Sequence, residues 1–119
     1  MQQVNAVPFD REEMLERLDG DTELLTDVLG VFLEECPRMM QEIRAAVDQG
    51  DSMSVRRTAH SIKGALLNIS AAPAAAEASQ LEQLGVDERL VETAEVLNQL
   101  QSEIDRLEPL LVAQTEVQS

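Results

Sequence analysis

The segment "RRTAHSIKGALLN", residues 56–68, contains the only histidine and the only lysine of the chain. His60 and Lys63 are three residues apart, and Gly64 follows directly. An exposed imidazole can act as a nucleophile, because one of its ring nitrogens is unprotonated near neutral pH. A lysine one turn away can neutralise phosphoryl charge, and a glycine leaves the space beside the ring open to a partner. The spacing therefore indicates phosphate chemistry at His60.

A helical wheel of residues 52–69 tests whether this histidine would be accessible. Apolar residues gather on one side of the wheel, which predicts a core face made of Val55, Ala59, Ile62, Leu66 and Ile69. At 100° per residue, His60 lies about 150° from the centre of that face and therefore points to solvent.

Further residues around His60 suit contact with a protein partner. Arg56, Arg57 and Lys63 are three of the nine basic residues of an otherwise acidic chain. They form a local positive patch that would attract an anionic partner site. Leu67 is an apolar residue on the same outward side and is expected to dock a partner. From the residues alone, an incidental surface histidine on an ordinary solvated face remains an equal alternative.

The composition limits the possible functions. A net charge of −14 argues against binding to nucleic acid and to anionic membrane surfaces, which both attract cationic proteins. Cys36 is the only cysteine, which excludes an intramolecular disulfide and, with a single histidine, the usual zinc sites. No metal or cofactor of its own is expected. No apolar run approaches the ~20 residues of a membrane span, and no signal peptide is evident. We expect a cytoplasmic protein.

The elements that must position His60 are all expected to be helices, because nothing alternates with the period of two of a strand. We therefore expect a single all-α domain over residues 9–113. It should be an antiparallel four-helix bundle with a short extra N-terminal helix. Residues 1–8 and 114–119 are expected to be flexible ends, and the bundle to be a monomer. The expected helices run from Asp10 to Gly20, from Asp21 or Thr22 to Gly50, from Asp51 or Ser52 to about Ile69, from Pro73 to Gly85, and from Asp87 onwards.

The sequence also predicts the effect of two prolines and the apolar faces of two of the helices. Pro37 should kink the second helix without dividing it, and Pro109 should disturb the end of the last one. The expected stripe of the second helix is Leu25, Leu29, Phe32, Cys36, Met39, Ile43 and Ala46. That of the last helix is Leu90, Ala94, Leu97, Ile104, Leu107 and Leu111.

The stretch "AHSIKGALLNISA" resembles the signature of histidine-containing phosphotransfer (HPt) domains, and "FDREEMLERLDGDTELLTDVLGVFLEECP" resembles the N-terminal half of that family. The resemblance implies a four-helix bundle in which His60 accepts a phosphoryl group from a receiver-domain aspartate and passes it to another receiver. Lys63 and Gly64 match the family's motif, and the resemblance implies that they support the transfer at His60. The resemblance further implies no kinase activity, a receiver that supplies Mg²⁺, and a histidine kinase or hybrid kinase upstream. Ser70 departs from the family, which usually has a second glycine there.

Several alternatives remain beside this interpretation. The chain could be an inert helical adaptor with an incidental His60, or the phosphorylated domain of a chemotaxis kinase, which "HSIKG" also resembles. A dimerising sensor-kinase domain would normally carry a proline shortly after the histidine, which this chain lacks. An enzyme that uses His60 as a general base has little support, because no glycine-rich phosphate loop or paired nucleophile accompanies the histidine.

Overall fold

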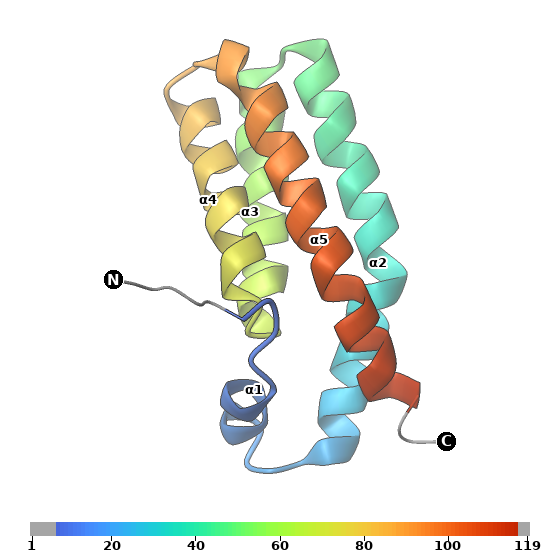
Figure 1. Ribbon diagram of the computed structural model, residues 1–119. Helices are drawn as coiled ribbons and strands as arrows, with labels where there is room; N and C mark the ends of the chain where they lie inside the picture. The colour runs from blue at the N-terminus through green and yellow to red at the C-terminus, as the bar shows by residue number, and fades with distance from the viewer. Residues whose placement is uncertain (1–6, 117–119) are drawn as a thin grey trace.

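A computed structural model describes residues 7–116 of the chain, and every regular element in that range is a helix (Figure 1). The elements are α1 (Arg11–Arg17), α2 (Thr22–Gln49), α3 (Ser52–Asn68), α4 (Ala72–Val86), the short 3₁₀ helix η1 (Leu90–Glu92) and α5 (Thr93–Glu116). Of the expected flexible segment 1–8, only Val7 and Pro8 are described. Of the expected tail 114–119, residues 114–116 belong to α5 and 117–119 lie outside the described range.

Aspartates begin the first three helices, as the sequence predicts. The side chains of Asp10, Asp21 and Asp51 each accept a hydrogen bond from the backbone N–H three residues later, at 3.1, 3.0 and 3.3 Å. Each carboxylate satisfies a donor that the first helical turn leaves without a partner, and its charge is favourable at the helix N-terminus. These caps fix where α2 and α3 begin and therefore the register of the residues that follow.

Helices α2 to α5 pack around a shared apolar core. Helix α3 contacts α2 on one side and α4 on the other, and α5 contacts both α2 and α4. The short α1 lies at the end of the molecule where α2 begins and α3 ends (Figure 1). The core face expected on α3 is confirmed, because Val55, Ala59, Ile62, Leu66 and Ile69 are all buried.

Two of the expected apolar stripes need correction. In α2 the buried methionine is Met40, whereas Met39 is only partly buried at the surface between α2 and α3. In α5 Ala94 is exposed, and Thr93, Val96 and Leu97 face the core. In α2 the difference is a shift of one residue between adjacent methionines, which the sequence pattern does not distinguish. In α5 the rest of the expected stripe, from Leu97 to Leu111, is buried, and only its start differs, because Leu90 lies in η1 and α5 begins at Thr93.

The end of α4 and the start of the next helix also differ from expectation. Gly85 does not end a helix but is buried inside α4, which continues to Val86. The chain turns instead at Glu88, which has a φ of +56°. Asp87 therefore does not begin the last helix; η1 intervenes, and α5 begins at Thr93.

Both interior prolines lie within continuous helices. Helix α2 passes through Pro37, as expected, and α5 passes through Pro109, where a disturbed end was expected. A proline removes one backbone hydrogen bond from a helix. Around Pro109, the buried Leu107 and Leu111 anchor the helix on both sides, so the packing of the apolar stripe offsets the lost bond.

Candidate functional site

His60 lies in the middle of α3 on the side opposite the core. About two-thirds of its side chain, 68%, is exposed to solvent, as the helical wheel predicts. Gly64, one turn further on, is also exposed, and a Cβ placed on it would meet nothing within 4 Å. Leu67 is 53% exposed one turn beyond. A partner molecule can therefore reach the imidazole along an open stretch of helix surface.

Glu82 on α4 joins this group, although the sequence did not single it out. One of its carboxylate oxygens, Oε2, lies 2.9 Å from His60 Nδ1, and the other, Oε1, lies 2.7 Å from Lys63 Nζ. A single carboxylate thus holds both side chains that the sequence marked, although it is 22 residues from the histidine. The Glu82 side chain is only 20% exposed, because it lies against α3.

The charge state of Glu82 decides where the imidazole carries its proton. Hydrogen bonding from Lys63 is the main cause that lowers the pKa of Glu82, and the hydrogen bond with His60 acts in the same direction. The carboxylate is therefore ionised at neutral pH and can only accept hydrogen bonds. It follows that Nδ1 of a neutral His60 donates its proton to Glu82, and that Nε2 keeps the free lone pair. Nε2 is therefore the ring nitrogen that is available to act as a nucleophile.

The arginines singled out in the sequence lie beside the imidazole. Arg56 and Arg57 are exposed and, with Met53, Ser61, His60 and Glu82, line an open hollow of about 550 Å³. The guanidinium groups bring positive charge to the surface beside the imidazole.

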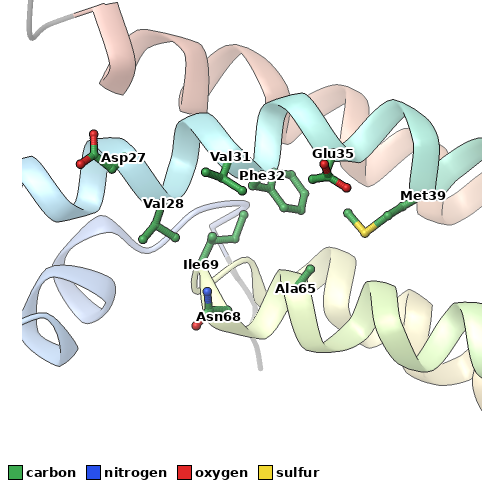
Figure 2. A pocket seen from close by; sticks show the side chains of 9 residues that line it. All are labelled: Asp27, Val28, Val31, Phe32, Glu35, Met39, Ala65, Asn68 and Ile69. Atoms are coloured by element: carbon green, nitrogen blue, oxygen red, sulfur yellow. The ribbon is translucent and has the colours of Figure 1, made fainter.

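A second concavity lies on the other side of α3, in the groove between α2 and α3 (Figure 2). We call it the α2–α3 groove. It has a volume of about 400 Å³, and its wall is mainly apolar, with two acidic residues from α2 at its edge. In Figure 2, Val28 and Met39 of α2 point toward Ile69, which follows directly after α3, and toward Ala65 of α3. The lining residues are Asp27, Val28, Val31, Phe32, Glu35, Met39, Ala65, Asn68 and Ile69.

The C-terminal end of α3 keeps a glycine-like conformation at Ser70. Ser70 has a φ of +58°, in the left-handed region where glycine is usual. The Arg17 guanidinium of α1 donates to the carbonyls of Leu67 and Asn68, at 3.2 and 3.1 Å, and to the Ser70 hydroxyl. Since a cation at a helix C-terminus is favourable, these bonds help to hold the end of α3 without the glycine.

No group of three or more histidine, cysteine, aspartate or glutamate side chains within residues 7–116 is arranged to hold a metal ion. Burial raises the pKa of the Cys36 thiol to about 11, and the charge of Glu108 adds to the increase. None of the described helices is both long and apolar enough to cross a membrane.

Comparisons with known proteins agree with this geometry. The family model of the Hpt domain matches residues 27–109, which include all of α3 and α4. The crystal structure of histidine-containing phosphotransfer protein B (HptB) from Pseudomonas aeruginosa PAO1 superimposes with a TM-score of 0.86. It is 21% identical in sequence, and the match covers 94% of this chain and 97% of that one. No curated protein matches significantly.

Proposed function

Since this chain belongs to the Hpt domain family and is therefore a phosphorelay intermediate, we propose that His60 is the residue that carries the phosphoryl group. One observation supports this assignment above all. The chain has a single histidine, and Glu82 holds that exposed ring by Nδ1 so that Nε2 is left as the nucleophile.

The transfer step follows from this arrangement. Nε2 attacks the phosphorus of an aspartyl phosphate on a receiver domain, the bond from phosphorus to the aspartate oxygen breaks, and the aspartate leaves as a carboxylate. His60 keeps its proton on Nδ1, so the phosphorylated ring is positively charged. Glu82, 2.9 Å away, offsets that charge. Lys63 lies one turn from the ring and neutralises charge on the phosphoryl oxygens in transit. The same steps in reverse deliver the group to the next receiver.

We propose that a metal ion assists the transfer and belongs to the partner. The receiver's own acidic pocket would hold Mg²⁺, whereas this chain would contribute no cofactor. Arg56 and Arg57 would face that acidic pocket and attract it to a chain whose net charge is −14. The partners would be receiver domains and, upstream, a histidine kinase or hybrid kinase.

We propose that the same receiver covers Leu67 and the α2–α3 groove. On the surface of α3, Gly64 lies between His60 and Asn68, which lines the groove. Because Gly64 has no side chain, the surface from the imidazole to the groove is uninterrupted. Leu67 is exposed beside it. A partner that seats its aspartate at Nε2 would therefore also bury these apolar residues, which would give the complex its hydrophobic contact area.

Further properties follow as proposals of the same kind. We interpret helices α2 to α5 as the antiparallel four-helix bundle expected from the sequence, with α1 as the extra N-terminal helix. We propose that the chain acts as a cytoplasmic monomer without kinase activity of its own and without nucleic-acid or membrane partners.

The assignment of His60 can be tested with aspartyl-phosphorylated receiver domains and Mg²⁺. We expect phosphate to appear on the wild-type protein and not on His60→Gln, whose fold should be intact because the side chain is exposed. The bound phosphate should be labile in acid and stable in alkali. A small phosphoramidate donor covers the case in which the receiver panel lacks the natural partner. Failure of both donors on folded protein would favour the inert adaptor instead.

A further inference from the structure

We infer that Gly85 of α4 is a positioning residue for phosphoryl transfer: because it has no side chain, α4 can approach α3 closely enough for Glu82 to hold the His60 ring. This inference rests on the proposed role of His60. It assigns a function to a glycine that touches neither the imidazole nor a partner.

The backbone of α3 lies directly against Gly85 of α4. A Cβ at this position would lie 2.8 Å from the backbone nitrogen of Arg56, 3.0 Å from its Cα and 3.0 Å from the carbonyl oxygen of Ser52. Carbon contacts in proteins normally begin at about 3.5 Å. All three atoms belong to the backbone of α3, so they cannot move aside as a flexible side chain would. A methyl group here would force the two helices apart.

No other glycine of the described helices has this property. A Cβ on Gly30 of α2 or on Gly64 of α3 would meet nothing within 4 Å. Gly85 itself is buried and is the last residue but one of α4, and its φ is not positive, so the turn after α4 does not require a glycine at this position. A glycine in a helix interior is less favourable than alanine. The close approach of the two backbones is the feature of the structure that accounts for it.

The contact at Gly85 lies close to His60 along the helix axes. Helices α3 and α4 are joined by a connection of three residues and run antiparallel (Figure 1). Glu82 is one turn before Gly85, or about 4.5 Å along the axis. The facing point on α3 lies about as far beyond Arg56, which is the level of His60. The backbone contact at Gly85 is thus one turn from the carboxylate that bridges the two helices.

The two bonds of Glu82 depend on the separation of α3 and α4. Both of its oxygens are engaged, one with His60 Nδ1 at 2.9 Å and the other with Lys63 Nζ at 2.7 Å. A wider separation would stretch both bonds together, because a rotation of the side chain that shortens one lengthens the other. Without the bond to Glu82, the imidazole would no longer be fixed with its proton on Nδ1.

The test uses the fact that the chain has one histidine, so a tag-free sample gives a single set of imidazole signals. Long-range ¹H–¹⁵N spectra of the unphosphorylated protein report which ring nitrogen carries the proton. For the wild type and for Gly30→Ala we expect the proton on Nδ1. For Gly85→Ala we expect a mixture shifted toward Nε2, with phosphorylation by phosphoramidate slowed roughly tenfold. A folded Gly85→Ala protein with the wild-type tautomer and rate would overturn the inference.

Two further variants separate positioning from stability. Leu111→Ala removes a fully buried side chain of α5 and should lower stability while leaving the His60 tautomer unchanged. Glu82→Asp shortens the side chain by one methylene and leaves the contact at Gly85 unchanged. This variant replaces Gly85→Ala in the test if Gly85→Ala fails to fold. We expect it to lose the Nδ1 proton preference; a wild-type tautomer would show that helix separation does not matter and would overturn the inference. If the tautomers change as expected but neither the wild type nor any variant accepts phosphate, the proposed function fails and the inference about Gly85 stands.

Discussion

The two sides of α3 are built in opposite ways. Toward α4, the helices meet backbone to backbone at Gly85, and Glu82 links His60 and Lys63 with short bonds. Toward α2, larger apolar side chains leave an open groove of about 400 Å³ whose edge carries two carboxylates (Figure 2). Atoms that react must be held within a fraction of an ångström, whereas a docking surface needs exposed apolar area. We interpret the α4 side as the part that sets the chemistry and the α2 side as the part that binds the partner.

Removing the carboxylate on the α4 side should have the largest effect. Glu82→Ala leaves Nδ1 and Lys63 without their shared partner, and we expect transfer from receivers to slow by about 10–100-fold, the range seen when groups that orient a histidine are removed. The loss should also appear with phosphoramidate, which needs no docking. Gln80→Ala, an exposed change on the same helix, is the matched control. Equal rates for Glu82→Ala and wild type would show that the α4 side does not set the chemistry.

A charge in the α2–α3 groove should impair docking but leave the chemistry intact. Val31 is 59% exposed, so Val31→Asp should fold normally. We expect it to raise the receiver concentration needed for half-maximal transfer about tenfold, because a carboxylate would have to be desolvated on binding, while the phosphoramidate rate stays unchanged. Val91 of η1 is 97% exposed, and Val91→Asp adds the same charge away from the groove. If both variants behave alike, the groove has no special role.

The smallest effect is expected at Gly64, which lies between the two sides. Its added methyl would meet nothing in the free protein, so Gly64→Ala should raise stability by about 0.5–1 kcal/mol in chemical denaturation. Transfer from receivers should nevertheless slow several-fold, since the methyl would obstruct a partner approaching the ring. Gly30→Ala should show the gain in stability alone. Unchanged transfer by Gly64→Ala would mean that the partner does not come close to this part of α3.

The sequence predicted one half of this site better than the other. The wheel placed His60 outward and Val55 and Ile62 inward correctly, because regular spacing within one helix determines which residues share a face. Glu82 was missed because its role depends on how α4 lies against α3. Nothing in "SQLEQLG" distinguishes this glutamate from an ordinary surface residue.

Gly85 was misinterpreted for a related reason. A glycine followed by polar residues is typical of a helix end, and the sequence does not reveal that a neighbouring backbone lies against it. The glycines with positive φ, at Gly20 and Gly50, do mark turns as expected. Local signals were sufficient for the first three helix caps, for the turns at Gly20 and Gly50 and for the faces of α3. They were not sufficient for contacts between helices, where the phase of Met39 and Met40 and the start of α5 were also decided.

We propose that Nε2 of His60 is the nucleophile because Glu82 holds Nδ1. The most direct test is to phosphorylate ¹⁵N-labelled protein and to identify the ring nitrogen that carries phosphorus from the ¹⁵N and ³¹P spectra. We predict a single phosphohistidine, with phosphorus on Nε2 and a proton on Nδ1. Phosphorus on Nδ1, or on a residue other than His60, would contradict the account.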